Sequence, residues 1–146
     1  MRIAVDISPI SSRSTSAHKV RGVGSYINML VTNLPKFDKK NEYLFIEDKK
    51  FPKDIDLIHY PYFDPFFIML PFYSNKKFVV TVHDLTPLVF KEHFPPGIKG
   101  IAKWLIQKQL LKRAQMIIAD SECSRDDIVR LVGIPKEKIR TVYLAA

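Results

Sequence analysis

A histidine and an aspartate follow an apolar run in the middle of the chain, in the segment TVHDLTPLVF over residues 81–90. Residues 78–83 are rich in β-branched side chains, which is typical of a strand, so His83 stands at the strand's end. In a cleft, its imidazole would serve as a hydrogen-bonding or acid–base group, because imidazole exchanges a proton near neutral pH. The alternative is a polar strand end, with Asp84 accepting hydrogen bonds from loop amides as an Asx turn.

Further polar residues stand at the ends of other predicted elements. His59 ends a predicted strand over residues 56–60 and could face the same crevice as His83, or be a polar side chain satisfied within the fold. Ser121 and Ser124 open a predicted helix, where they either cap its amides or contact a substrate. Cys123 is interpreted as a small packed residue and not as a nucleophile, because no histidine lies near it in the sequence.

A glycine motif, Gly22-Val23-Gly24, opens another predicted helix after a long polar loop over residues 8–21. Backbone amides at a helix N-terminus favour a phosphate, and glycine lets such a ligand approach closely. The dinucleotide-binding fingerprint is not met, because its third glycine position is Ile27 and the loop is too long. The alternative is that the glycines only begin the helix.

The elements that must position these residues alternate along the chain. Helices are predicted at residues 22–34 (ended by Pro35), at 97–114 with an apolar stripe that includes Ile98, Ile101 and Leu105, and at 121–132 (stopped by Gly133). Strands are predicted at residues 3–7, 42–47, 56–60, 78–83, 116–119 and 138–144.

Such alternation predicts the α/β class, as a Rossmann-like three-layer sandwich with a mostly parallel sheet. Ligands bind such sheets at the carboxyl ends of the strands. We therefore expect Gly22, Gly24 and His83 to converge at that edge.

Composition limits the function classes. The chain has 146 residues, enough for one domain, a single cysteine and no metal-ligand spacing. Its net charge of +8 suits phosphates, anionic lipid or nucleic acid, but no nucleic-acid-binding signature is present. The aromatic stretch at residues 60–73 is too short and too rich in proline to span a bilayer. It is a buried loop, a partner surface or a membrane-dipping element beside Lys76 and Lys77.

The order and spacing of several segments resemble the N-terminal half of a GT-B glycosyltransferase of family 4. They are MRIAVDISPI, RGVGSYINMLV, DLIHYP, TVHDLTPLVFKEHFPP and the long tail containing IIADSECSRDDI and GIPKEKIRTVYL. This resemblance implies two Rossmann-like domains that face each other across a cleft, the N-terminal one binding mainly the acceptor. It also implies sugar transfer from a nucleotide-sugar donor with retention of configuration, with no metal and no cofactor.

The resemblance assigns roles to residues at matching positions. Gly22, Val23 and Gly24 match the glycine loop near the donor phosphate and sugar, and His83 matches the histidine that lines the sugar site. The residues expected to line the cleft or the acceptor site are His59, Asp84, Ser121 and Ser124.

The family is about twice as long as this chain, so residues 1–146 are expected to be the acceptor-side domain, with the donor-binding domain absent. The fragment alone is then expected to be inactive, because the residues that hold the diphosphate are missing. The expected partners are a nucleotide-sugar, a glycan or lipid-linked acceptor, the missing domain and the inner face of a membrane, in the cytoplasm and without nucleic acid. The competing hypotheses are a non-catalytic Rossmann-like module, one chain of a split transferase and a basic nucleic-acid-binding domain.

Overall fold

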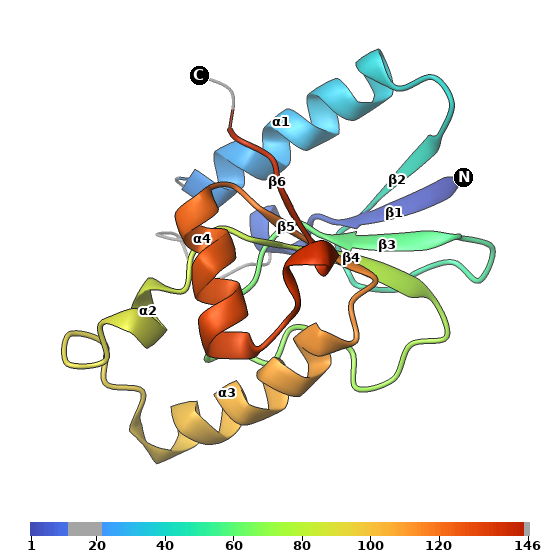
Figure 1. Ribbon diagram of the computed structural model, residues 1–146. Helices are drawn as coiled ribbons and strands as arrows, with labels where there is room; N and C mark the ends of the chain where they lie inside the picture. The colour runs from blue at the N-terminus through green and yellow to red at the C-terminus, as the bar shows by residue number, and fades with distance from the viewer. Residues whose placement is uncertain (12–21, 145–146) are drawn as a thin grey trace. The chain divides into compact units, whose positions relative to one another are not determined.

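The computed structural model describes residues 1–11 and 22–144 (Figure 1). The chain divides into two compact units. The first consists of Met1–Tyr62 with Lys76–Phe78, and the second of Phe63–Asn75 with Val79–Ala146. Most of the predicted loop over residues 8–21 lies outside the described residues.

The first unit is built on three parallel strands: β1 (Arg2–Asp6), β2 (Glu42–Ile46) and β3 (Leu57–Tyr60). β1 lies between β2 and β3, and Ala4 pairs in register with Leu44 on one side and Ile58 on the other. Ala4 and its neighbour Val5 are completely buried, as a continuous apolar run in a covered parallel sheet requires. Because all three strands run the same way, their carboxyl ends meet at one edge.

Helix α1 (Gly22–Phe37) connects β1 to the parallel strand β2, so it must run antiparallel to them and begin at their carboxyl edge (Figure 1). It lies against η1 (Ser8–Ile10), the 3₁₀ turn that follows β1, and buries Ile27. The prediction that Pro35 ends the helix is wrong. Proline removes only one amide near the helix end, where the Asp38 amide still donates to the Leu34 carbonyl at 3.0 Å.

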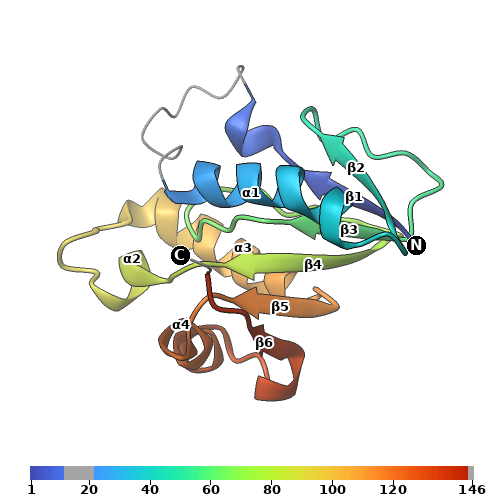
Figure 2. The same ribbon diagram turned by 90° about the horizontal axis from the view of Figure 1, so that it is seen from above.

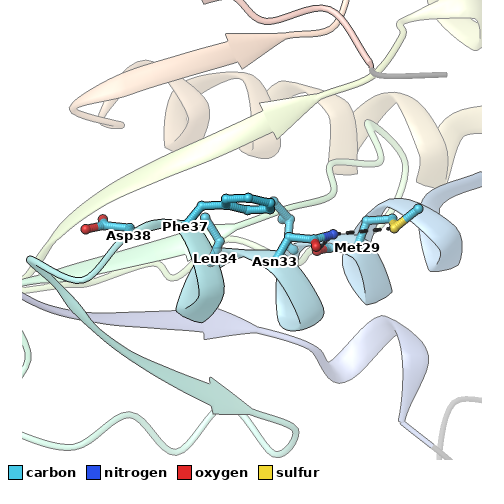
Figure 3. Close-up of a pocket in the computed structure, with 6 residues that line it drawn as sticks. Met29, Asn33, Leu34, Phe37 and Asp38 are labelled. Carbon is cyan, nitrogen blue, oxygen red and sulfur yellow. Dashed lines mark hydrogen bonds between the residues drawn. The ribbon is translucent and has the colours of Figure 1, made fainter.

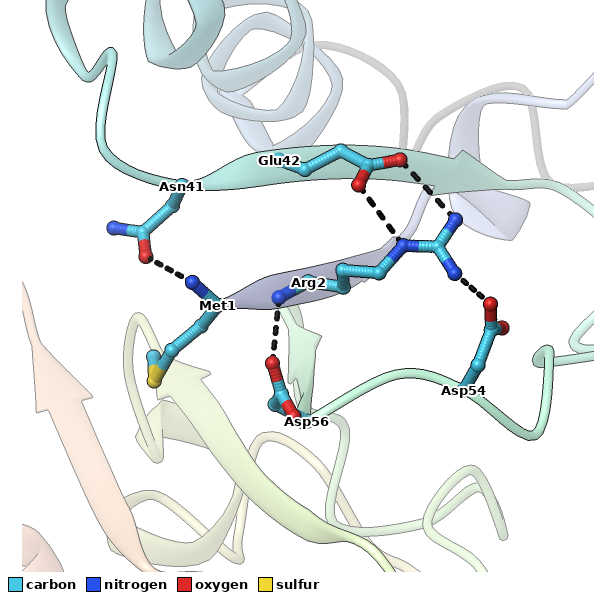
Figure 4. A network of polar contacts seen from close by, with 6 residues as sticks. All are labelled: Met1, Arg2, Asn41, Glu42, Asp54 and Asp56. Atoms are coloured by element: carbon cyan, nitrogen blue, oxygen red, sulfur yellow. Dashed lines mark hydrogen bonds and ion pairs between the residues drawn. The ribbon is translucent and has the colours of Figure 1, made fainter.

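The amino edge of the first unit is held by one arginine (Figure 4). The Arg2 guanidinium donates to both carboxylate oxygens of Glu42 at 2.9 and 3.1 Å and also pairs with Asp54. Its backbone amide donates to the Asp56 carboxylate at 2.7 Å. These contacts join β1 to β2 and to the loop before β3, which fixes the strand register at this edge.

The second unit contains most of β4 (Lys77–Val82) and all of β5 (Met116–Ala119) and β6 (Ile139–Thr141). The order is β4-β5-β6 with parallel pairing, and Val80 lies beside Ile117, which lies beside Ile139. Val80, Val82 and Ile117 are fully buried. The predicted strands are found, with β6 shorter than expected.

Three helices accompany these strands: α2 (Thr86–Val89), α3 (Gly97–Lys112) and α4 (Glu122–Asp127). α4 lies against β5 and β6 and continues as a π-helical turn over Ile128–Val132 (Figure 2). Gly133 ends it with a φ of 77°, a left-handed conformation that glycine adopts without strain. The predicted helix start and the glycine stop are therefore confirmed.

α3 forms where it was predicted. Unlike an ordinary amphipathic helix, however, it turns its apolar stripe away from the core. Its buried residues are Gly100, Gln107, Leu110 and Leu111. The apolar stripe that periodicity reveals, which includes Ile98 and Leu105, lies on the exposed side.

Parallel strands that alternate with helices confirm the predicted α/β, Rossmann-like fold. Within the described residues, no helix combines the length and the apolar character needed to cross a bilayer.

Candidate active site

His83 follows β4 directly, and Asp120 follows the neighbouring strand β5. Val82 and Ala119 pair in register, so the next residue of each strand is brought to the same place at the carboxyl edge. His83 Nδ1 lies 3.3 Å from Asp120 Oδ2. The two side chains are 14% and 18% exposed, so both are shielded but neither is sealed from solvent.

The Asp120 contact fixes the chemistry of the ring. An ionised carboxylate only accepts hydrogen bonds, so His83 Nδ1 must carry a proton to make this contact. In the neutral ring, Nε2 is then the atom with the lone pair. The pair can therefore hold a hydroxyl or exchange a proton at a defined atom.

Ser121 and Ser124 support this pair from the first turn of α4. Ser121 Oγ accepts from the Ser124 amide at 3.0 Å, which confirms the predicted N-cap. Ser121 Oγ also donates to Ser124 Oγ at 2.9 Å. The single proton of the Ser124 hydroxyl goes to the His83 carbonyl at 2.6 Å, the nearer acceptor, in preference to Asp120 Oδ1 at 3.2 Å. The serines thus anchor the backbone of His83.

Two other predictions in this unit have different outcomes. Asp84 Oδ1 accepts from the Thr86 amide at 2.9 Å, so the interpretation of Asp84 as an Asx turn is confirmed. The prediction that Cys123 is packed is wrong, since it is exposed. The second residue of a capped helix points outward when the cap and the third residue are the ones that face the strands.

The carboxyl edge of the first unit carries a different arrangement. Asp6 ends β1 and is only 2% exposed, and its Oδ1 accepts from the Ser8 amide at 2.9 Å. Lys49 Nζ lies 3.8 Å from Asp6 Oδ2. Burial, followed by the negative charge of Asp6, raises the pKa of Tyr60 at the end of β3 above its ordinary value. Tyr60 also packs edge-on against Phe51 with ring centroids 5.9 Å apart.

The glycine motif and His59 belong to this same edge. Gly22 begins α1 and is exposed, and a Cβ built there would meet no described residue within 4 Å. Gly24 is buried, and Val23 is partly exposed. His59 pairs in register with Val5, one residue before the end of β3, and is partly exposed.

The structure therefore groups the predicted residues in two sets. His83, Asp84, Ser121 and Ser124 lie together in the second unit, whereas the glycine motif and His59 lie in the first. The expected convergence of Gly22, Gly24 and His83 stays a prediction.

Asp120 was missed by the sequence reasoning, although a signal was present. It stands between the predicted strand 116–119 and the serine that caps the next helix, in the same position relative to its strand as His83. Aligning the residues that follow neighbouring parallel strands would have paired them. Asp6, the last residue of β1, carries a similar signal.

A hollow lies elsewhere in the first unit, along α1 (Figure 3). It has a volume of about 260 Å³ and is mostly apolar, with Met29, Asn33, Leu34 and Phe37 among its lining residues. These residues belong to the second half of α1, away from its N-terminus. No cluster of three or more acidic, histidine or cysteine ligands for a metal occurs in residues 1–11 and 22–144.

Comparison with known proteins agrees with the sequence pattern. The family described as Glycosyltransferase Family 4 matches the chain over residues 12–145. No curated protein matches it.

Proposed function

Because the chain belongs to glycosyltransferase family 4, we propose that it is the N-terminal, acceptor-side domain of a retaining glycosyltransferase. Such an enzyme moves a sugar from a nucleotide-sugar to a glycan or lipid-linked acceptor. The observation that carries the proposal is the 3.3 Å contact between His83 Nδ1 and Asp120, which orients an imidazole at the carboxyl edge of parallel strands.

The transfer breaks the bond between the anomeric carbon and the diphosphate oxygen. A bond forms between that carbon and an acceptor hydroxyl oxygen, and the hydroxyl proton passes to an oxygen of the departing diphosphate. The nucleotide diphosphate leaves with the bonding electron pair, so negative charge grows on its oxygens. Amides of Gly22, Val23 and Gly24 at the N-terminus of α1 suit that charge, and glycine lets the phosphate approach the backbone.

In this proposal, His83 is the catalytic residue. Because Nδ1 is hydrogen-bonded to Asp120, Nε2 is the ring atom that would contact a sugar hydroxyl near the reacting carbon. Asp120 positions the ring, and Ser124 positions the backbone that carries it. Ser121 and Asp84 complete the wall through their cap and turn, and His59 is assigned to the acceptor side.

This chain by itself is proposed to be inactive. Backbone amides alone offer little charge to a departing diphosphate, which needs cations aimed at its oxygens. A second domain that holds the nucleotide would supply those cations. We place the reaction in the cytoplasm, with a hexose such as mannose as the transferred sugar and polysaccharide or lipopolysaccharide as the product class.

The test joins the chain to a donor-binding domain and supplies UDP- and GDP-sugars with glycan and lipid-linked acceptors. The expected result is sugar transfer with the donor's anomeric configuration kept in the product, read by NMR. The chain without the second domain is the control and should give none. An inverted product, or donor binding without transfer to any acceptor, contradicts the proposal; the second result identifies a non-catalytic binding module.

A further inference from the structure

Lys49 follows β2 at the carboxyl edge of the first unit and has an unusual backbone conformation. Its φ is 58°, and within residues 1–11 and 22–144 it is the one residue other than glycine with a positive φ. This left-handed region disfavours a side chain larger than hydrogen, and glycine, asparagine and aspartate are the residues usually found there. A lysine at this position therefore needs an explanation beyond the turn itself.

The turn that contains Lys49 is fixed by hydrogen bonds of its neighbours. The Lys50 amide donates to Asp48 Oδ1 at 3.1 Å, which closes an Asx turn around Lys49. Just before the turn, the Ile7 amide donates to the Ile46 carbonyl at 2.9 Å, so the end of β2 is tied to the segment that follows β1. Neither hydrogen bond involves the lysine side chain, so a glycine or an asparagine would serve this turn equally well.

The side chain of Lys49 reaches toward the strand ends. Its Nζ lies 3.8 Å from Asp6 Oδ2. Asp6 is 2% exposed, whereas the side chain of Lys49 is 42% exposed, so the ammonium group lies between a buried carboxylate and solvent. An ion pair with one partner open to solvent typically contributes little to stability. Stability alone therefore does not explain a lysine in a strained conformation, whereas strained residues are common in binding sites.

The register of the strands indicates which site Lys49 borders. Asp6 pairs with Ile46 of β2, and Val5, the residue before Asp6, pairs with His59 of β3. The ends of the three strands thus bring Lys49 and His59 to the same edge of the first unit, on either side of β1. His59 is assigned to the acceptor side in the proposed function, so Lys49 lies at the border of that region.

We propose that the Lys49 ammonium group binds the negatively charged group of an acidic sugar acceptor, which is a carboxylate or a phosphate. An ammonium group is a compact charge with three hydrogen-bond donors, and it pairs with either oxyanion. Asp6 is too deeply buried to meet the ligand, and it holds the ammonium group at the edge. The negative charge of the neighbouring Asp48 is compensated by Lys50, whose Nζ lies 3.8 Å from Asp48 Oδ2.

This inference rests on the proposed function, because it names the class of acceptor, but it is tested by binding without a donor or a second domain. A transferase that uses a neutral acceptor would keep the proposed function and contradict this inference. Binding of acidic sugars by a chain that transfers no sugar in the two-domain protein would do the reverse. The two failures are therefore distinguishable.

The experiment titrates the chain with glucuronate, glucose 6-phosphate, glucose and inorganic phosphate at constant ionic strength. NMR follows the amide signals of residues 47–50 and the ε-methylene signal of Lys49. The two acidic sugars are expected to shift these signals and to bind at least about fivefold more tightly than glucose, because a charge-assisted hydrogen bond is added. Their affinity should fall as salt is raised. The stronger of the two identifies the charged group that the site prefers.

Three substitutions of Lys49 separate its charge from its backbone. Lys49→Met removes the charge and should lower the affinity for both acidic sugars to that for glucose. Lys49→Asn also removes the charge but suits the left-handed backbone, so it should lose binding while it unfolds at a higher temperature than Lys49→Met. Lys49→Arg keeps a cation and should keep the affinity within about threefold.

The matched control is Lys50→Met, which removes the same charge from the next residue of the turn. The side chain of Lys50 is 86% exposed and pairs with Asp48, so this variant should bind the acidic sugars as the unchanged chain does.

An absence of signal shifts with both acidic sugars, or equal binding of glucose and the acidic sugars, overturns the proposal. Equal losses of affinity in Lys49→Met and Lys50→Met overturn it as well. So does inorganic phosphate that binds as tightly as glucose 6-phosphate, because the site then takes an anion and not an acidic sugar. Binding of an acidic sugar that Lys49→Met and Lys49→Asn lose and Lys49→Arg keeps establishes it.

Discussion

The carboxyl ends of β1 and β5 each carry a carboxylate, but the surroundings of the two differ. Asp6 at the end of β1 is 2% exposed, and one of its carboxylate oxygens accepts a hydrogen bond from the Ser8 amide. Asp120, beside the end of β4, is 18% exposed and meets the ring of His83. Position at a strand end is shared, so position alone does not identify a functional residue.

The partner and the exposure make the difference. A buried carboxylate that accepts from a backbone amide holds the chain in place, and its loss leaves that amide without its partner. A carboxylate that accepts from an imidazole near solvent sets the tautomer of a group that can exchange protons. We therefore expect substitutions at the β1 end to act on stability and those at the β4 end to act on transfer.

The largest effect on stability is expected for Asp6→Ala. The Ser8 amide and Lys49 would lose their partner in a site with little access to water, so the free energy of unfolding should fall by about 2 kcal/mol. Urea denaturation measures this. The matched control, Asp48→Ala, removes an exposed carboxylate and should change the value by less than about 0.5 kcal/mol. Equal losses of unfolding free energy in the two variants would show that burial of the carboxylate does not decide its contribution to stability.

Asp120→Ala should act mainly on transfer in the two-domain protein. Without the carboxylate, the His83 ring is free to change tautomer, so kcat should fall about tenfold with little change in KM. Unfolding should shift by less than about 1 kcal/mol because the pair is partly solvated. Asp120→Asn, whose amide oxygen can still accept from Nδ1, should recover part of kcat. A pure loss of stability with unchanged kcat would make Asp120 structural, like Asp6.

Ser121→Ala should cost about 1 kcal/mol, because it removes the N-cap of α4. Thermal unfolding checks this value. Ser25→Ala, at an exposed position of α1, is the control and should be neutral within about 0.5 kcal/mol. If both serines behave alike, the cap does not stabilise the wall behind His83.

The smallest effect is a pH dependence at the β1 end. Burial and then Asp6 raise the pKa of Tyr60, so in the folded chain it stays neutral at pH values where the unfolded chain ionises. Stability from this group is thus complete below the ordinary pKa of 10.0 and is lost as pH rises above it. Tyr60→Phe should flatten the decline in unfolding free energy above that pH. An unchanged slope would show that Tyr60 contributes nothing to it.

The strands were predictable because their side chains repeat a simple pattern. Buried parallel strands read as unbroken apolar runs, and the segments around Val80 and Ile117 do so. The end of α4 was equally clear, since only glycine adopts the φ of Gly133 without strain. Each of these signals is local in the sequence.

What the sequence did not show depends on contacts between distant residues. The pairing of His83 with Asp120 follows from the register of two strands 37 residues apart. The orientation of α3 was hidden because Gln107, a polar residue, is on its buried side to satisfy the carbonyls of residues 64 and 67. Periodicity finds an apolar stripe but not the partner that covers it.

The most direct test of the central claim is sugar transfer by His83→Ala in the protein joined to its donor-binding domain. We predict a loss of kcat of about 100-fold or more, as for removal of a group that acts on the reacting sugar, with unfolding changed by less than about 0.5 kcal/mol. His93→Ala, which removes an exposed imidazole from the loop before α3, should keep full activity. Transfer by His83→Ala within about twofold of the unchanged protein would contradict the claim that the β4 end is the reacting site.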